Sequence, residues 1–467
     1  MCLIRLEETQ SKLFFQNPDD IIKSINSNKI QVCVVGIGRI GLPTALSFAN
    51  SGLSTIGVDI NQKLIQTIKS GIFPLKDEPE YDKIFEDVKN KKNFQVTANI
   101  TDAFPQSDVV LLSLPTPMDQ NNVPDYSALR SVGKQLGELI SPGTLVIVES
   151  TIEPGFIEEE LSKIIENSSN DLKAGVDFGI GVCPETANPG EIYVDFTKLP
   201  RLVGAIDQKT SEIIFQIYKH VFPVELIKMP DCKTANAVKL TTNVFRDLNI
   251  AFVNELSLLF EKLGVDTFTV LDAAQKKYNF QIHYPGPGVG GPCLPVNSYQ
   301  MLNSASKFNS NLLELVKIGR QVNESMTDNV IRLTLDAIKE KELNIKNCNV
   351  LILGVSYKAD VKDIQITPAE PLIKKIKDLG ASIKIFDPYF IDQTIFGIST
   401  ESNLESALSS CDVAIFVTNH KQFYQIDPSI FSSTMKNPIV IDTRNVLDPK
   451  SISKLNIIYR GIGHVSF

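Results

Sequence analysis

The sequence lacks the residue patterns that mark several common protein classes. Its seven cysteines are odd in number and form no CxxC pair, and its four histidines show no metal-ligand spacing. Paired cysteines mark disulfide frameworks and zinc sites, so we expect a reduced, cytoplasmic protein with no metal centre. The net charge of −8 leaves no basic excess for binding nucleic acid. No apolar run approaches the roughly 20 residues of a membrane span, and acidic residues interrupt any signal-peptide core at the N-terminus.

What is present indicates several domains. A chain of 467 residues, 43% of them hydrophobic, suffices for two or three cores. Strand-like apolar runs alternate with helical stretches over 31–230 and again over 346–467, a pattern that favours parallel sheets wound with helices. Between them, 231–345 shows helical spacing, with no Pro or Gly from its start to Gly264. We therefore predict an α/β fold of two Rossmann-like doubly wound domains joined by a long central helix, after an N-terminal extension, 1–30, with one helix near DDIIKSIN.

The clearest ligand signal is GIGRIG at 36–41, which follows an apolar strand and precedes an apolar helix. In a dinucleotide-binding fold the first glycine makes the tight turn, the second admits the pyrophosphate and the third allows close packing of helix and strand. Asp59 ends the next strand and is expected to accept hydrogen bonds from the ribose hydroxyls. No arginine follows Asp59 to bind a 2′-phosphate, so NAD is favoured over NADP. The predicted cofactor-binding residues of this region are Gly36, Ile37, Gly38, Arg39, Ile40, Gly41 and Asp59.

Two further groups of polar residues stand where a ligand is expected. Thr116 and Thr151 follow strands of the first predicted sheet, and ligands of open α/β sheets bind beyond the carboxyl ends of the strands. Thr116 and Thr151 are therefore expected to face the cofactor or the substrate, and an ordinary loop threonine is an equal alternative for each. Lys239, Asn243 and Arg246 lie at i, i+4 and i+7 on the long helix and therefore share one side. This stripe is either a solvated face or a pair of oxyanion donors, lysine and asparagine, with a neighbouring arginine.

The loop GPGVGGPCLPVN, residues 286–297, surrounds a single cysteine, Cys293, with glycine and proline. Glycine permits close approach of a backbone, and proline stiffens a loop. The loop is either a structural turn with an incidental cysteine or a support that presents a nucleophilic thiol to a substrate.

Together these segments resemble the nucleotide-sugar 6-dehydrogenase family, which includes the UDP-glucose and UDP-N-acetylhexosamine dehydrogenases. The resemblance runs from about residue 31 to 467. It is carried by GIGRIGLPTA (36–45), LPTP (114–117), ESTIEPG (149–155), CPE (183–185), KLTTNVFRDLNIAFVNE (239–255), GPGVGGPC (286–293), GVSYKAD (354–360) and DTRN (442–445).

The resemblance implies a twofold oxidation, in which NAD takes a hydride from C6 of the sugar and Cys293 attacks the resulting aldehyde. A second NAD oxidises the thiohemiacetal to a thioester, and water releases the uronic acid. The third region is expected to bind the UDP group, and the long helix is expected to build a homodimer. The implied roles are oxyanion stabilisation by Lys239 and Asn243, water activation by Thr151, Glu185 and the residue at Asn297, contact of Thr116 with the cofactor, and substrate binding by Arg246, Gly290, Lys358 and Arg444.

The substrate branch is indicated by two positions. Arg246 before an Asn-Ile-Ala run, and Pro295-Val296 after the cysteine, look like the N-acetylhexosamine branch. UDP-N-acetylmannosamine and UDP-N-acetylglucosamine are therefore the favoured substrates, and a UDP-glucose 6-dehydrogenase is the alternative. A dehydrogenase with one hydride transfer would leave Cys293 idle, and a nucleotide-sugar-binding homologue with impaired catalysis would form no NADH.

The last alternative rests on departures from the family pattern. Cationic or carboxylate residues of the family are replaced here by Asn297, Thr186, Asn279 and Gln365, and Pro292 stands where histidine is common. A charge-assisted hydrogen bond contributes about 1.5–3 kcal/mol, so two lost cations weaken binding by about 10²–10⁴ unless Lys362 or Lys276 replaces them. An amide cannot act as a base, so Asn297 predicts slow thioester hydrolysis.

Overall fold

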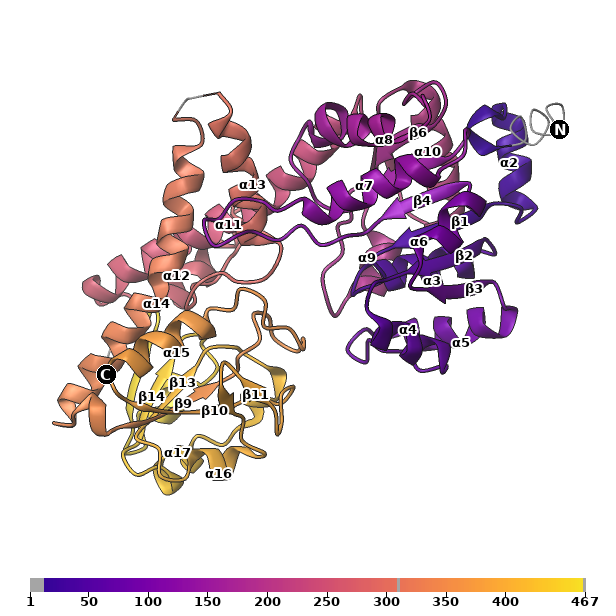
Figure 1. Cartoon of the computed structure of the whole chain (residues 1–467). Coiled ribbons are helices and arrows are strands. Elements are labelled where there is room, and N and C mark those ends of the chain that lie inside the picture. Colours follow the sequence, from indigo (N-terminus) through magenta and orange to yellow (C-terminus); the bar gives the residue numbers. More distant parts are fainter. Residues whose placement is uncertain (1–11, 309–310, 465–467) are drawn as a thin grey trace. The chain divides into compact units, whose positions relative to one another are not determined.

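The computed structural model describes residues 12–308 and 311–464. It contains two compact units (Figure 1). The first comprises residues up to Thr242 together with Tyr299–Lys307, and the second comprises Asn243–Ser298 with the residues from Phe308 onward. The predicted division at residues 30, 230 and 345 stays a prediction. The α/β character of both terminal regions is confirmed.

The first unit is built on an eight-stranded sheet in the order β3-β2-β1-β4-β5-β6-β7-β8. All neighbouring strands are parallel except β6 and β7, which are antiparallel. Reversal of the sequence order at β1 leaves a crevice beyond the ends of β1 and β4, where such sheets bind ligands. The strands are β1 (Gln31–Val35), β2 (Ser54–Val58), β3 (Phe94–Thr97), β4 (Val109–Leu112), β5 (Leu145–Val148), β6 (Gly179–Val182), β7 (Arg201–Ala205) and β8 (Leu226–Lys228).

Helices cover both faces of this sheet, because alternate strand residues point into two separate cores. Val32 and Val34 belong to one core, and Cys33 and Val35 belong to the other. The first core is closed by α2 (Pro18–Asn26), α3 (Gly41–Asn50), α4 (Gln62–Lys69), α5 (Tyr81–Lys91), α9 (Ile192–Lys198) and α10 (Gln208–Val221). The second is closed by α6 (Ile100–Ala103), η2 (Phe104–Gln106), α7 (Ser127–Leu139), η3 (Ile157–Leu161) and α8 (Ser162–Ser168).

The helix predicted in the N-terminal extension is confirmed as α2. Asn17 caps it by accepting a hydrogen bond from the Asp20 backbone N–H, and Pro18 occupies the first turn, where its missing N–H costs nothing. Ile21 and Ile25 of α2 are buried in the first core, as is Phe14 of η1 (Leu13–Phe15). Residues 12–30 therefore form part of the first unit, and the rest of the predicted extension, 1–11, lies outside the described residues.

The second unit carries a five-stranded parallel sheet in the order β10-β9-β13-β14-β15. One face packs on α14 (Glu314–Glu340) and α15 (Ala369–Asp378), and the other on α16 (Leu404–Leu408), η5 (Lys421–Gln425), α17 (Ser429–Thr434) and α18 (Pro449–Ile452). The strands are β9 (Asn349–Leu353), β10 (Ser382–Phe386), β13 (Val413–Phe416), β14 (Ile439–Asp442) and β15 (Ile458–Gly461), with a hairpin of β11 (Thr394–Ile395) and β12 (Ile398–Ser399); η4 (Ile345–Asn347) precedes β9.

The predicted long helix is confirmed as α11 (Cys232–Leu263), whose 32 residues span about 48 Å. The chain continues through α12 (Thr267–Ala274) to α13 (Leu294–Ser306), which starts directly after Cys293. Both α11 and α13 contribute residues to each unit.

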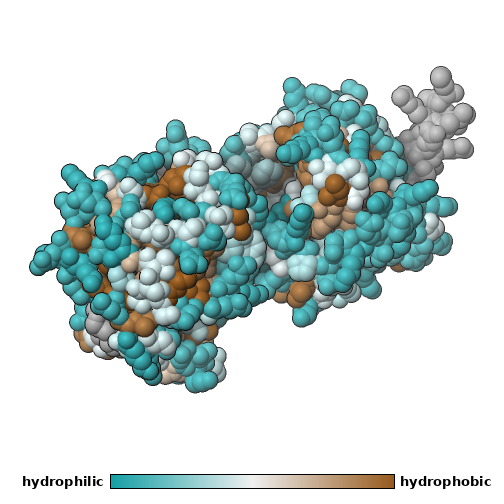
Figure 2. All heavy atoms as spheres, turned by 90° about the horizontal axis from the view of Figure 1, so that it is seen from below, coloured by the Kyte–Doolittle hydropathy of each residue, from teal (hydrophilic) through white to brown (hydrophobic). Residues whose placement is uncertain are grey.

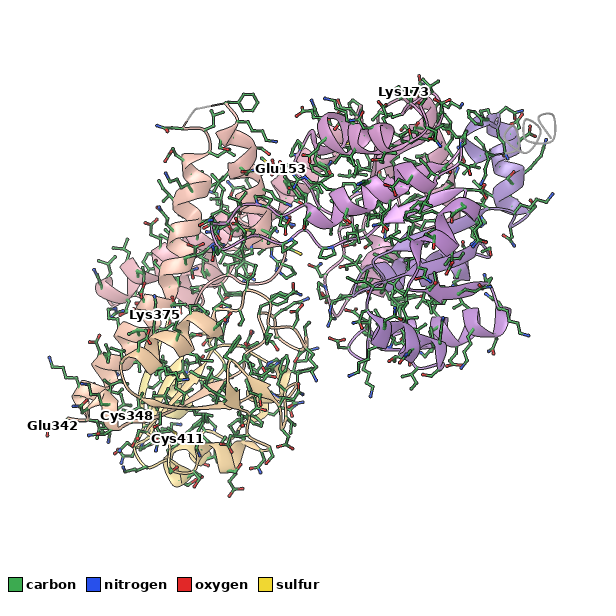
Figure 3. All side chains as sticks on the ribbon, in the orientation of Figure 1. Glu153, Lys173, Glu342, Cys348, Lys375 and Cys411 are labelled. Atoms are coloured by element: carbon green, nitrogen blue, oxygen red, sulfur yellow. The ribbon has the colours of Figure 1, made fainter. Side chains whose placement is uncertain are left out.

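Buried cysteines pack among the apolar core residues of both units. Of the cysteines in the described part of the chain, only Cys293 is exposed. Cys348 and Cys411, labelled in Figure 3, lie in the second unit and pack in its two cores. Apolar side chains also reach the surface among polar ones in both units (Figure 2).

Candidate active site

The glycine loop after β1 has the geometry of a dinucleotide turn. Gly36 has φ +88°, and a Cβ there would lie 2.4 Å from the Ser113 carbonyl oxygen. At Gly41 a Cβ would lie 2.0 Å from the Gly36 carbonyl oxygen, so both positions exclude a side chain. A Cβ at Gly38, by contrast, would meet nothing within 4 Å. Because α3 starts at Gly41, the open face of Gly38 lies beside a helix N-terminus, where a pyrophosphate fits.

Asp59 follows β2 at the same edge of the sheet. Its carboxylate Oδ1 accepts a hydrogen bond from the Asn61 backbone N–H at 2.9 Å, and Asn61 in turn caps α4. The carboxylate is partly exposed, and Ile60 beside it is 90% exposed. These residues fit the adenosine half of NAD, with Asp59 as acceptor for ribose hydroxyls.

Arg39, inside the glycine motif, forms an ion-pair cluster that sequence reasoning missed. Its guanidinium donates to Glu78 Oε1 at 2.8 Å and to Asp77 Oδ2 at 2.7 Å. Glu78 has a fully buried side chain and also accepts from the Gly190 backbone N–H at 2.7 Å. Arg39 therefore ties the glycine loop to the segment that follows Glu185. The glycine motif does not indicate Glu78 as a partner of Arg39, because Glu78 lies 39 residues away along the chain.

Thr116 and Thr151 lie together at the ends of β4 and β5. The Thr116 hydroxyl donates to the Thr151 carbonyl oxygen at 2.9 Å, and Gln300 of α13 donates to the same oxygen at 3.0 Å. Glu153, labelled in Figure 3, accepts from Asn303 at 2.7 Å and pairs with Lys307 at 3.1 Å. The second half of α13 is therefore anchored on the loop that carries Thr151.

Glu185 and Lys239 form the charged part of the site in the first unit. Glu185 is 9% exposed and Lys239 is 8% exposed. Burial, the largest effect, raises the pKa of Glu185 above its usual range, while the Lys239 ammonium and Arg201 oppose that rise. The Glu185 carboxylate accepts a short hydrogen bond from the Ala187 N–H. A buried carboxyl with a raised pKa is suited to proton transfer at neutral pH.

In the second unit Cys293 is exposed immediately before the first turn of α13. A helix N-terminus favours negative charge on a nearby sulfur. The Asn297 N–H donates to the Cys293 carbonyl oxygen at 2.8 Å, and the Asn243 side-chain amide donates to Asn297 Oδ1. Asn243 and Asn297 are thus brought together, four residues along α13 from the thiol.

The glycines of the cysteine loop make room for two other segments of the second unit. A Cβ at Gly290 would lie 2.4 Å from the Ile366 carbonyl oxygen, and one at Gly291 would lie 2.6 Å from the Tyr357 ring. Lys358, next to that tyrosine, therefore belongs to a segment packed on the loop. A Cβ at Gly286 would lie 2.5 Å from Nη1 of Arg444, so the arginine also lies against the loop.

Arg444 is a partly buried cation. Its Nε donates to the Val417 carbonyl oxygen at 3.0 Å, and burial lowers the pKa of its guanidinium to about 10. A guanidinium can bind a diphosphate through charge-assisted, bidentate hydrogen bonds. Arg246 is exposed on α11, where it lies close enough to the loop residue His283 to help burial lower the pKa of that imidazole.

The positions that depart from the family pattern are distributed over both units. Thr186 follows Glu185 and is half-buried, Asn279 is exposed after α12, and Gln365 accepts from the Gly291 N–H through its carbonyl oxygen. Lys276 and Lys362 are exposed, and Lys362 lies 5.4 Å from the centroid of the Phe390 ring. The amide side chain at Asn297 is 2% exposed.

Within residues 12–308 and 311–464, none of the helices combines the length and apolar character needed to cross a membrane. The same residues contain no group of three or more His, Cys, Asp and Glu side chains arranged to hold a metal ion.

Comparison with protein families matches three consecutive segments of the chain. Residues 30–222 match the NAD binding domain of the UDP-glucose/GDP-mannose dehydrogenase family, residues 233–325 match its central domain, and residues 351–449 match its UDP binding domain. The first segment contains the glycine loop and Asp59, and the last contains Lys358 and Arg444.

Individual relatives match over nearly the whole chain. The UDP-N-acetyl-D-mannosamine dehydrogenase of Pyrococcus horikoshii is 31% identical, covering 93% of this chain and 99% of the relative, and its solved structure superposes with a TM-score of 0.86 over the same shares. A UDP-N-acetyl-D-glucosamine 6-dehydrogenase of Salmonella typhi is 30% identical over 85% of this chain and 92% of its own. The structure of the UDP-N-acetyl-mannosamine dehydrogenase Cap5O of Staphylococcus aureus is 29% identical, with a TM-score of 0.79 over 93% of this chain and 98% of that one. The chain therefore belongs to the UDP-glucose/GDP-mannose dehydrogenase family and is an NAD-dependent nucleotide-sugar dehydrogenase.

Proposed function

We propose that the protein oxidises the C6 hydroxyl of a UDP-N-acetylhexosamine, UDP-N-acetylmannosamine or UDP-N-acetylglucosamine, to the uronic acid. Relatives that are about 30% identical over most of the chain bear the names of enzymes for these two sugars. The observation that carries the proposal is the arrangement around Cys293. Its loop packs against the Lys358 segment and against Arg444, so an exposed thiol and two cations for a diphosphate belong to one compact unit.

The proposed reaction consumes two NAD and one water for each sugar. NAD supplies the hydride acceptor in both oxidation steps. The first step turns the C6 alcohol into an aldehyde and releases a proton. The Cys293 sulfur then adds to the aldehyde carbon, and loss of a second hydride and proton gives the thioester. Water breaks the carbon–sulfur bond, releasing the carboxylic acid and returning the thiol.

Lys239 and Asn243, one turn apart on α11, would donate hydrogen bonds to the C6 oxygen as it gains negative charge. Glu185, kept largely out of water, would accept the proton of the hydrolytic water, assisted by the Thr151 hydroxyl. Gly36–Gly41, with Asp59 and Thr116, would hold the dinucleotide. Arg246 and Lys358 would contact the sugar nucleotide, with Arg444 on the diphosphate and Gly290 beside the sugar.

Asn297 is expected to slow the hydrolytic step, because the amide cannot act as a base. Asn297→Asp is sterically conservative, and the Asn243 amide that donates to Asn297 can donate equally to a carboxylate. We expect faster turnover and less thioester by mass spectrometry of the intact protein. Unchanged turnover together with unchanged thioester would count against this role for position 297.

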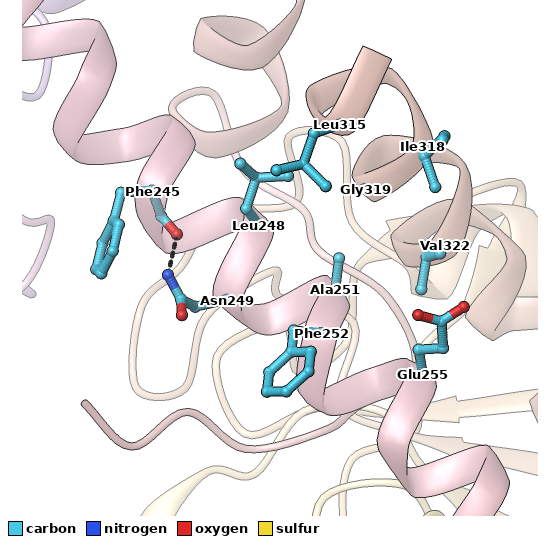
Figure 4. A pocket seen from close by; sticks show the side chains of 10 residues that line it. All are labelled: Phe245, Leu248, Asn249, Ala251, Phe252, Glu255, Leu315, Ile318, Gly319 and Val322. Carbon is cyan, nitrogen blue, oxygen red and sulfur yellow. Dashed lines mark hydrogen bonds between the residues drawn. The ribbon is translucent and has the colours of Figure 1, made fainter. Parts of the chain in front are cut away.

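A homodimer is supported by an apolar groove between α11 and α14 (Figure 4). Phe245 and Phe252 are each 51% exposed there, as is Ile318, and Leu315 is 69% exposed. Contiguous exposed apolar surface of this kind favours protein association. We propose that a second copy covers the groove and that the reaction takes place in the cytoplasm.

A second candidate function is nucleotide-sugar binding with impaired oxidation. It is favoured by Asn297 and by the replacement of family cations at Thr186, Asn279 and Gln365, none of which carries a positive charge. This candidate predicts binding of UDP-sugar without NADH.

The deciding experiment counts NADH per sugar. Limiting UDP-N-acetylmannosamine, UDP-N-acetylglucosamine and UDP-glucose are each mixed with excess NAD and purified protein. Two NADH from an N-acetylhexosamine support the proposal, and two from UDP-glucose alone assign the other branch. One NADH, retained in Cys293→Ser, would indicate one-step chemistry, and none with any sugar would support the impaired homologue.

A further inference from the structure

A buried polar network lies behind the cysteine loop, inside the second unit. Asp247 and Asn254 of α11, Asn323 of α14 and Ser298 of α13 are each no more than 2% exposed. None of these residues belongs to the catalytic set described above. Because buried polar side chains are costly unless they are hydrogen-bonded, a cluster of four on three helices calls for an account.

One end of the cysteine loop is attached to this network at Gly286. The Gly286 backbone N–H donates to Asn254 Oδ1 at 2.9 Å, and Asn254 Nδ2 donates to Asn323 Oδ1 at 2.9 Å. Asn323 Nδ2 then donates to Asp247 Oδ1 at 2.8 Å and to the Asp247 carbonyl oxygen at 3.0 Å. Gly288 packs on the Asn323 carbonyl oxygen, which a Cβ there would approach to 3.2 Å.

The other end is attached at Ser298, five residues after the cysteine. The Ser298 hydroxyl donates to Asp247 Oδ2 at 2.7 Å. The guanidinium of Arg320 donates to Asp247 Oδ1 at 2.9 Å, and the side chains of this ion pair are 4% and 2% exposed. Asp247 therefore uses both carboxylate oxygens, one toward α14 and one toward the first turns of α13.

We propose that Asp247, Asn254, Asn323 and Ser298 are positioning residues for the Cys293 thiol. The chain between the two attachment points, Gly286 and Ser298, contains the cysteine near its middle. Both attachments are hydrogen bonds to side chains of α11, and Asn323 and Arg320 of α14 hold those side chains in place. The loop is therefore fixed from both ends on α11, with α14 as support. This proposal rests on the proposed role of Cys293 as nucleophile.

Positioning has a consequence specific to the second oxidation. Hydride removal from the alcohol does not need the thiol, whereas hydride removal from the thiohemiacetal requires the carbon–sulfur bond to have formed. A loosened loop therefore slows the second NADH more than the first. A purely structural role would instead lower stability and slow both steps alike.

The test compares Asn254→Ala and Ser298→Ala, which release one attachment each, with Ser298→Thr, which keeps the hydroxyl. Thr334→Val is the matched control, because Thr334 is a buried hydroxyl on α14 that donates to the Val330 carbonyl oxygen at 2.8 Å. Backbone amide exchange of the segment 286–298 is measured by mass spectrometry without substrate. The two NADH phases are then measured in a single turnover.

We expect amide exchange in 286–298 to become at least about ten-fold faster in both alanine variants, corresponding to about 1.4 kcal/mol of lost protection. It should be unchanged in Thr334→Val and restored in Ser298→Thr. The ratio of the second to the first NADH rate should fall by about ten-fold in the same two variants.

Unchanged exchange in both alanine variants would overturn the attachment itself. Faster exchange with an unchanged ratio of NADH rates would overturn the positioning role. If the unaltered protein forms no NADH at all, the proposed function fails, and the exchange measurement alone decides whether the network fixes the loop.

Discussion

Arg201 of the first unit is a deeply buried cation that has a charged partner. Its side chain is 2% exposed, and its guanidinium carbon lies 4.3 Å from the Phe196 ring centroid and 3.8 Å from that of Phe222. Its Nη1 lies 3.7 Å from Glu149 Oε1, and Glu149 is fully buried and accepts from the Tyr218 hydroxyl at 2.6 Å. The arginine therefore balances a carboxylate that has no access to water.

Arg201→Met removes that balance while keeping an unbranched side chain between the two rings. Breaking one partner of a buried pair costs about 3–5 kcal/mol, because the remaining charge is left uncompensated. At about 2–4 °C per kcal/mol, the melting temperature should fall by roughly 6–20 °C. Adding Glu149→Gln removes the stranded charge and keeps an acceptor for Tyr218, so the double variant should recover most of the loss.

The assay is thermal unfolding by calorimetry, with guanidinium titration of the same variants. Arg130→Met is the matched control, because Arg130 pairs with Glu160 at the surface, where the side chains are 46% and 39% exposed. Such a pair contributes about 0–1 kcal/mol. If Arg201→Met costs no more than this control, or the double variant is no more stable than Arg201→Met, the pairing argument is wrong.

Three further predictions address single positions. Gly38→Ala should leave the melting temperature unchanged, because its Cβ would meet no protein atom, yet raise the KM for NAD about ten-fold or more, about 1.4 kcal/mol, because the Cβ would meet the pyrophosphate. Gly36→Ala, by contrast, should fail to fold stably. An unchanged KM in Gly38→Ala would refute the turn geometry. Glu80→Gly should stabilise the protein by about 0.5–1 kcal/mol in chemical unfolding, because Glu80 has φ +73°, and a loss of stability would contradict this. Burial raises the pKa of Asp387, but His420 and three backbone N–H groups together hold it below 3.8. The stability that ionised Asp387 contributes is therefore present above pH 3.8 and is lost as the pH falls through the lowered pKa. Asp387→Asn should be less stable near pH 6 and lose less stability on acidification, and parallel curves of stability against pH for the two proteins would disprove the pairing.

Much of the fold follows from local sequence, because its central strands are short apolar runs that are buried on both faces. Gln31–Val35 and Asn349–Leu353 read as strands for this reason, and the uninterrupted helical spacing after residue 231 predicts α11. The apolar pattern does not determine whether a strand runs parallel or antiparallel to its neighbours. β7 reads like its neighbours but pairs antiparallel to β6, since its connection stays at one end of the sheet. The final strand, Ile458–Gly461, carries a weaker signal, because Tyr459 and Arg460 interrupt its apolar pattern.

The candidate site shows the same limit at the level of side chains. Cys293 and Arg444 stand in recognisable motifs, so the sequence is enough to propose their roles. Arg201 and Glu78 carry no such mark, because their charged partners, Glu149 and Arg39, lie far away along the chain. Arg201 begins a strand, as a solvent-facing arginine often does, and only the packing of Phe222 and Glu149 around it identifies a buried ion pair.

The glycine-rich motifs show why the sequence of a motif does not by itself assign a function to each glycine. Gly36 and Gly38 belong to one motif, yet only Gly38 has an open face, so it alone is free to serve a ligand while Gly36 serves the chain. In the cysteine loop, a Cβ at Gly290 would lie 2.4 Å from the backbone carbonyl oxygen of Ile366, whereas one at Gly286 would meet only the guanidinium of Arg444. Packing against the backbone therefore explains Gly290 before any sugar is considered. A substrate role for Gly290 stays a prediction, and it has to be tested by KM at constant stability, because a side chain there would disturb the loop whether or not a ligand binds.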